Sequence, residues 1–91
     1  LNLNLIENAL NDVEEAIQLS KNIAAPFVLR AKIHVFSGLY QDALTDCDRA
    51  LMIDNNDYGA NLIKAYIFNY FKQFEKALPY YNKVISLKHS K

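Results

Sequence analysis

The side chains that could do chemistry in this sequence are two histidines, one cysteine and a pair of aspartates. His34 and His89 could each bind a metal ion, but neither has a second ligand at a suitable spacing. Cys47 could be a nucleophile, but no activating base is evident near it in the sequence. Asp42 and Asp46 stand four residues apart, as a pair of acids on one helix face would, but nothing indicates a cleft around them. The sequence therefore predicts no catalytic residue and no metal-binding residue.

Motifs for cofactors are also missing. Gly38 and Gly59 are the two glycines, too few for a glycine-rich phosphate loop, and neither a nucleophile elbow nor an H-E-x-x-H pair occurs. We therefore expect no cofactor and no enzymatic activity. The same side chains have structural interpretations: His34 as a core or hydrogen-bonded residue, His89 as a helix-end residue, and Cys47 as a small buried hydrophobe.

Composition limits the class of protein. With 91 residues, 52% apolar and 22% charged, the chain suits one folded domain better than a disordered segment. Its longest apolar stretches, such as residues 23–29, fall short of the roughly 18 residues that a membrane span needs. One cysteine cannot form an internal disulfide, and no Asn-x-Ser/Thr site occurs. We therefore expect a soluble protein of a reducing compartment, the cytoplasm or the nucleus.

An internal repeat of 34 residues determines the architecture. Residues 24–57 align with residues 58–91 at this offset, and the same offset reaches back into the first 23 residues. The identical pairs between the two full repeats are Ala31/Ala65, Ile33/Ile67, Ala43/Ala77 and Leu44/Leu78. The chain is therefore predicted to be a single domain over residues 1–91, with the second half of a truncated repeat at 1–23 followed by the two full repeats.

Within each full repeat, apolar residues recur every three or four positions, which predicts a hairpin of two amphipathic helices. Gly38 stands where the first helix must end, and glycine tolerates the left-handed conformation common there. Asp57 can cap the following helix. Pro26 suits the first turn of its helix, whereas Pro79 predicts a late start or a slight bend in the last helix. Residues 1–4 are expected to be the end of a leading helix.

These periods and positions resemble the tetratricopeptide repeat, whose signature runs aromatic, small, Gly, aromatic, Ala, aromatic, Ala. The matching places hold Phe27, Ala31, Gly38, Tyr40, Ala43, Cys47 and Ala50 in one repeat, and Asn61, Ala65, Lys72, Phe74, Ala77, Tyr81 and Val84 in the next. The resemblance implies an all-α fold, a right-handed superhelix of antiparallel helix pairs with about two and a half repeats. The alanines would let paired helices approach closely, and Tyr40, Phe74 and Tyr81 would fill the spaces between hairpins.

The resemblance also implies a function. Repeats of this family hold a peptide segment or a helix of another protein in a concave groove lined by the leading helix of each repeat. Carried onto this sequence, the groove is mostly apolar and contains tyrosines, a residue type enriched at interface hot spots. The expected partner-binding residues are Val28, Leu29, Lys32, Phe36, Leu62, Ile63, Tyr66, Asn69 and Tyr70, with Ala25, Val35 and Gly59 beside them. Alternatively, a further helix or a neighbouring hairpin covers these apolar residues.

The best-known ligand of the family is the acidic tail of heat-shock chaperones, held by a clamp of Lys, Asn and Arg. The corresponding positions here are Leu29, Gly59 and Ile63, whose side chains cannot hold a carboxylate. We therefore expect a scaffold or adaptor for a different protein segment, and not a co-chaperone of that kind.

The charges are unevenly spread although the formal net charge is zero. Residues 1–57 carry four basic and nine acidic residues, net −5, and residues 58–91 carry six lysines and one glutamate, net +5. Lysines on the outside of a solenoid usually confer solubility, so we do not expect nucleic-acid binding by the basic end, whose lysines include Lys64, Lys72, Lys76, Lys83 and Lys88. The opposite charges allow a structural alternative, head-to-tail self-association or docking through unfinished solenoid ends.

Acidic residues also mark the trailing helices. Stacking at the 34-residue offset predicts repulsive contacts of Asp12 with Asp46 and of Glu14 with Asp48. These four residues and Asp42 would form a solvated acidic stripe, which could also recruit a basic partner. Because about three such units normally stack, we expect the chain to be a piece of a longer solenoid or to complete itself with a partner.

Overall fold

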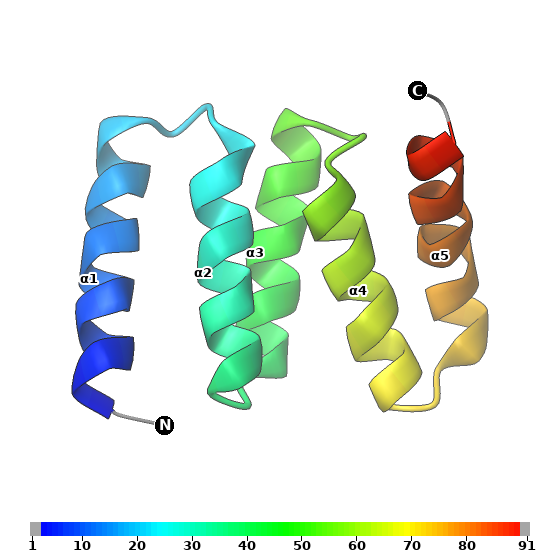
Figure 1. Cartoon of the computed structure of the whole chain (residues 1–91), viewed down its shortest axis with the longest axis horizontal. Coiled ribbons are helices and arrows are strands. Elements are labelled where there is room, and N and C mark those ends of the chain that lie inside the picture. The colour runs from blue at the N-terminus through cyan, green and yellow to red at the C-terminus, as the bar shows by residue number, and fades with distance from the viewer. Residues whose placement is uncertain (1–2, 90–91) are drawn as a thin grey trace.

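Five helices and no strands make up residues 3–89, the part of the chain that the computed structural model describes. They are α1 (Leu3–Leu19), α2 (Ala24–Phe36), α3 (Tyr40–Ile53), α4 (Tyr58–Tyr70) and α5 (Phe74–His89). Figure 1 shows them side by side, each antiparallel to the next, with α1 at one end and α5 at the other. The predicted all-α fold is confirmed, and the handedness of the superhelix stays a prediction. Within the described residues, no helix is both long and apolar enough to cross a membrane.

Small residues let the helices pack as hairpins. The most extensive contacts join α2 to α3 and α4 to α5. Ala31 of α2 and Ala43 and Ala50 of α3 are fully buried, as is Ala65 of α4, while Ala77 of α5 is only 2% exposed. Side chains larger than alanine at these places would separate the helix axes, so the predicted role of the alanines in close packing is confirmed.

The leading helices α2 and α4 end in the same kind of turn. Leu39 and Gln73 each donate a backbone N–H to the carbonyl five residues earlier, at 2.8 Å in both cases. The residue just before each of them takes the left-handed conformation, Gly38 at φ 76° and Lys72 at φ 61°. These are Schellman motifs, which satisfy carbonyls left open at a helix end. The left-handed role predicted for Gly38 is confirmed.

The predicted helix cap and one of the two predicted proline positions agree with the structure, and the other proline position does not. Asp57 caps α4, its Oδ1 accepting the N–H of Ala60 at 2.8 Å. Pro26 is the third residue of α2, in the first turn as predicted. The late start predicted from Pro79 is wrong, because α5 begins at Phe74 and contains the proline.

Two further predictions are corrected at the ends of the row. Leu3 and Asn4 belong to α1 itself and do not end a separate leading helix, while residues 1 and 2 lie outside the described residues. Phe74 was expected to fill a space between hairpins, but it lies on α5, the last helix of the row, and is 59% exposed. Tyr40 and Tyr81 are half-buried.

A buried ionic cluster joins α2 to α3. Asp46, only 2% exposed, accepts from Nε and Nη2 of Arg30 at 2.9 and 2.8 Å. Its second oxygen lies 2.7 Å from Nδ1 of His34, which donates because a carboxylate can only accept. Asp46 is therefore not part of an exposed acidic stripe, and that prediction is wrong for this residue. The hydrogen-bonded role predicted for His34 is confirmed.

Cations lie between the stacked trailing helices α1, α3 and α5. Arg30 also reaches back to Glu14 of α1 at 3.6 Å, and Lys64, one repeat later, pairs with Asp48 of α3. Looking forward, the Lys64 ammonium lies 4.7 Å from the ring centroid of Tyr80, the residue one repeat after Asp46. For Glu14, Asp46 and Asp48 the predicted repulsion between acids of successive trailing helices is wrong, because a leading helix places a cation beside each of these three acids.

Candidate protein-binding pocket

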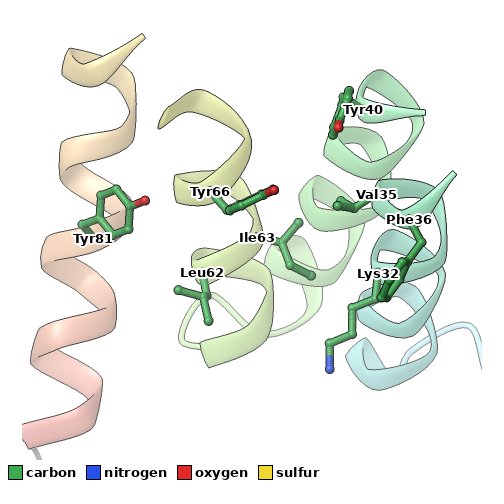
Figure 2. A pocket seen from close by; sticks show the side chains of 8 residues that line it. All are labelled: Lys32, Val35, Phe36, Tyr40, Leu62, Ile63, Tyr66 and Tyr81. Carbon is green, nitrogen blue, oxygen red and sulfur yellow. The ribbon is translucent and has the colours of Figure 1, made fainter. Parts of the chain in front are cut away.

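An open pocket of about 580 Å³ lies across four helices. Eight residues line it, and we refer to it as the tyrosine pocket: Lys32, Val35 and Phe36 of α2, Tyr40 of α3, Leu62, Ile63 and Tyr66 of α4, and Tyr81 of α5. Figure 2 shows these side chains facing a shared space, with Tyr81 projecting from α5 toward Tyr66. The volume lies within the range typical of ligand sites, and the lining is almost entirely apolar or aromatic.

Helical spacing explains why the leading helices dominate the lining. On each leading helix the lining positions share one face, because side chains three and four residues apart lie one above the other. These positions are 32, 35 and 36 of α2 and 62, 63 and 66 of α4. Several of them are open to solvent: Phe36 is 71% exposed, Tyr66 48% and Leu62 39%. Large apolar side chains gathered on one open face are typical of an interaction site.

A cluster of stacked rings supports one wall of the tyrosine pocket. The Tyr40 ring stacks on Tyr70 with centroids 5.1 Å apart, and Tyr70 stacks on Tyr66 at 6.4 Å. Phe71 packs edge-on against both Tyr40 and Tyr70, at 5.3 and 5.2 Å. Such offset and edge-to-face pairs each add roughly 0.5–1.5 kcal/mol beyond their buried area. The cluster therefore holds Tyr66 and Tyr40 in place before any ligand arrives.

The polar groups of the tyrosine pocket are few. Burial raises the pKa of the Tyr40 phenol above its ordinary 10.0, and the neighbouring Tyr70 raises it further, so this phenol is neutral at pH 7. Lys32 is the one formally charged residue of the lining, and it makes no ion pair within residues 3–89. Its ammonium is therefore available to a carboxylate or a carbonyl oxygen of a ligand.

The structure gathers most, but not all, of the residues predicted to bind a partner. Lys32, Phe36, Leu62, Ile63 and Tyr66 line the tyrosine pocket together. They come from two helices one repeat apart, as the predicted groove requires.

The other four predicted residues lie elsewhere. Tyr70 supports the wall through its stacking, and Asn69 is exposed outside the lining. Leu29 lines a different hollow, between α1 and α2. Val28 is only 7% exposed, and its Cγ1 would lie 2.8 Å from a Cβ placed on Gly59. Its assignment as a partner-binding residue is therefore wrong, because it packs against the backbone of α4.

Sequence reasoning missed Tyr40 and Tyr81 as lining residues. Both were assigned to the space between hairpins, since both stand at aromatic positions of a trailing helix. Their rings are only half-buried, so each contributes one side to the packing and the other to the pocket. An aromatic residue at an inter-hairpin position beside a groove is the signal that could have identified them.

Residues considered for chemistry or nucleic-acid binding have structural partners. Cys47 is fully buried, and burial raises the pKa of its thiol to about 12, so it is a poor nucleophile at pH 7. In the part of the chain that is described, no group of three or more potential ligands could hold a metal ion. The Lys64 side chain is only 11% exposed and is engaged with Asp48 and Tyr80, so this lysine of the basic end is not free for phosphate.

Comparison with known families agrees with this geometry. Residues 58–90 match the family model of the tetratricopeptide repeat. No curated protein matches the chain. Tetratricopeptide repeats generally mediate protein–protein interactions and are generally non-catalytic modules. The matched residues are the second full repeat, α4 and α5, so this part of the chain is similar to the tetratricopeptide repeat, in an all-helical structure consistent with that kind of repeat.

Proposed function

We propose that the chain is a scaffold or adaptor module that binds a segment of another protein in the tyrosine pocket. The observation that carries this proposal is the open, aromatic lining, contributed by the same face of two successive leading helices. Phe36 and Tyr66 stand 71% and 48% exposed there. A partner that covered them would remove from water a large apolar area that the fold itself leaves uncovered.

The chemistry of the lining indicates what the bound segment contributes. Apolar or aromatic side chains of the partner would pack between Tyr66 and Tyr81 and against Ile63 and Leu62. A carboxylate of the partner would pair with Lys32 at the edge. Because the stacked rings are already ordered, the entropic cost of ordering side chains on association is smaller. Binding and placement of a partner, without chemistry, is the resulting activity.

A peptide-display selection tests this proposal. The folded protein is used to select binding peptides, and their affinities are then measured against a Tyr66→Ser variant and a Tyr58→Ser control. Tyr58 lies on the same helix and is 45% exposed, close to the 48% of Tyr66, but is not part of the lining. We expect Tyr66→Ser to weaken binding at least about tenfold and Tyr58→Ser to leave it unchanged. Equal effects of the two substitutions would refute the proposal.

Docking through the end of the row is the second candidate, and an exposed stripe on α5 favours it. Phe74, Leu78 and Ile85 follow one face of this helix and are 59%, 57% and 56% exposed. If copies associate through this apolar stripe, light scattering will find an oligomer at about 50 mM salt that persists at about 500 mM. If the opposite charges of the two ends hold the copies together, the oligomer will dissociate at the higher salt. A monomer at both salts would exclude self-association.

A further inference from the structure

A hollow of about 350 Å³ lies where α3, the end of α4 and the start of α5 meet. Figure 1 shows these three helices as successive neighbours in the row. Seven residues line the hollow, none of them shared with the tyrosine pocket, and we refer to it as the glutamine hollow: Gln41 and Leu44 of α3, Ile67 and Phe68 of α4, Phe71 and Gln73 of the following turn, and Lys76 of α5. Ligand sites range from roughly 300 to 1,000 Å³, so this volume suits a small molecule.

The inner part of the glutamine hollow is apolar and already ordered. Ile67 is fully buried and forms its floor. The Phe71 ring is 49% exposed but is held edge-on by the rings of Tyr40 and Tyr70, and the Phe68 ring lies 5.9 Å from that of Tyr80. Two phenylalanine rings therefore stand in place at the hollow before a ligand arrives. Since aromatic rings gain by packing on other rings, this part favours an aromatic group.

The rim of the glutamine hollow is polar and positively charged. Its polar residues are Gln41, Gln73 and Lys76, all exposed, and no acid is among the lining residues. The ammonium groups of Lys64 and Lys76 each lie 5.9 Å from the Phe68 ring centroid. Lys64 is already paired with an acid of α3, whereas Lys76 makes no ion pair within residues 3–89. An ammonium and two amide groups are all hydrogen-bond donors, so the rim favours a carboxylate.

The equivalent place one repeat earlier has the opposite charge. The residues 34 positions before the lining are Glu7, Leu10, Ile33, His34, Ser37, Leu39 and Asp42. Acids thus take the places of Gln41 and Lys76, and a serine takes the place of Phe71, so an anion would be repelled there. The chemistry of the glutamine hollow therefore belongs to this one position and not to the repeat in general.

The opening of the glutamine hollow does not depend on where the row of helices ends. Gln73 and Lys76 correspond to Leu39 and Asp42 of the preceding repeat. Both of these residues are exposed although α4 and α5 follow them, Leu39 at 47%. A following hairpin therefore leaves this side of the row uncovered.

We infer that the glutamine hollow binds a small aromatic carboxylate. The ring of the ligand packs against Phe68 and Phe71, and its carboxylate pairs with the Lys76 ammonium. The side-chain amides of Gln41 and Gln73 donate to the remaining lone pairs of the carboxylate. Binding is reversible and involves no covalent step. The module thus carries a small-molecule site on residues separate from those that bind its protein partner.

A titration followed by methyl NMR tests this inference, with 4-fluorophenylacetate as the probe. We expect the methyl signals of Leu44 and Ile67 to shift with a Kd of about 1 mM, because the probe gains one ring contact and one charged contact in an open hollow. The methyl signals of Leu62 and Ile63, which line the tyrosine pocket, should stay in place. The control compound 4-fluorophenylacetamide has nearly the same shape without the charge and should bind about tenfold more weakly.

Variants of the rim separate the proposed contact from general effects of charge. Lys76→Gln should weaken binding of the carboxylate about tenfold and leave binding of the amide unchanged, because the two groups form one contact. Lys88→Gln, a change at an exposed lysine of the same helix outside the lining, should alter neither. Gln41→Glu, which introduces the acid of the preceding repeat at nearly constant shape, should also weaken binding of the carboxylate. The methyl spectrum without probe shows that each variant is folded.

Four outcomes would overturn the inference. They are shifts at Leu62 and Ile63 in place of Leu44 and Ile67, equal affinities of the acid and the amide, equal losses with Lys76→Gln and Lys88→Gln, and no shifts at about 20 mM probe. Tighter binding of acetyl-Gly-Gly-Phe, which carries the same ring and carboxylate at the end of a chain, would assign the hollow to a protein C-terminus and overturn the small-molecule assignment. Since Tyr66→Ser leaves the lining of the glutamine hollow intact, either proposal can fail without the other.

Discussion

The left-handed turns after α2 and α4 are equivalent positions of the two repeats, one held by glycine and the other by lysine. Substituting each residue by the other therefore measures how the left-handed conformation affects the stability of the fold. Gly38 and Lys72 stand one repeat apart and have φ angles of 76° and 61°. The residue after each of them donates a backbone hydrogen bond of the same length, 2.8 Å. Only one of them is a glycine. Replacing Lys72 by glycine should therefore raise the stability of the fold, and replacing Gly38 by lysine should lower it by a similar amount.

The magnitude follows from two opposing terms. A residue with a Cβ gives up roughly 1–2 kcal/mol in the left-handed conformation, and Lys72→Gly removes this cost. Glycine in turn makes the unfolded chain more flexible, which costs about 0.4–1 kcal/mol. The net gain is roughly 0.5–1 kcal/mol, or an increase of roughly 2–8 °C in Tm for a chain of this size. At Gly38 no atom lies within 4 Å of an added Cβ, so its substitution measures the backbone term without a clash.

Urea unfolding followed by circular dichroism measures both changes. A Lys72→Ala variant serves as the control, because it removes the charged side chain but keeps a Cβ in the left-handed conformation; we expect it to stay within about 0.5 kcal/mol of the wild type. Unchanged m values would show that the substitutions change the unfolding free energy without changing the surface exposed on unfolding. If Lys72→Gly fails to exceed Lys72→Ala in unfolding free energy, then the strain assigned to Lys72 is absent.

Two other predictions concern buried polar groups. Asp46→Ala leaves Arg30 and His34 without their acceptor. Because the Arg30 side chain is 23% exposed, water can replace part of the contact, and we expect the unfolding free energy to fall by about 2–4 kcal/mol. The control Asp42→Ala should lower it by less than about 0.5 kcal/mol. For Cys47, burial raises the pKa of the folded thiol from 9.0 to about 12, so its contribution to stability is complete below pH 9 and is lost as the pH rises toward 12. Between pH 9 and 10.5 the wild type should lose up to about 1.4 kcal/mol per pH unit more than Cys47→Ala in urea unfolding, and parallel curves would contradict this.

Much of the fold could be predicted because it depends on spacing and residue size. A period of 34 residues, alanines at paired positions and a glycine between helices each have one physical interpretation in a helical hairpin, and Ala31, Ala43 and Gly38 take those places. Residues that depart from the pattern were harder to interpret. Lys72 adopts the glycine conformation despite its Cβ, and Pro79 is accommodated within α5, because packing of the hairpin outweighs a local preference.

The tyrosine pocket was predictable only where one helix decides the direction of a side chain. Lys32, Phe36 and Tyr66 face it because they share one face of a leading helix with the other lining residues. Val28 differs because its environment depends on how closely α2 approaches Gly59 of α4, a distance between elements that a periodic pattern does not contain. The sequence pattern thus specifies faces, whereas burial is decided by the pairing of those faces.

The two full repeats reach the same geometry through different chemistry at the position between trailing helices. Arg30 is held by the carboxylates of Glu14 and Asp46, whereas Lys64 is held by Asp48 and by the ring of Tyr80. An arginine has the planar fork that matches a buried carboxylate, and an ammonium suits the face of an aromatic ring. Each cation is therefore matched to its own acceptor, and equivalent positions of the repeats are not interchangeable one residue at a time.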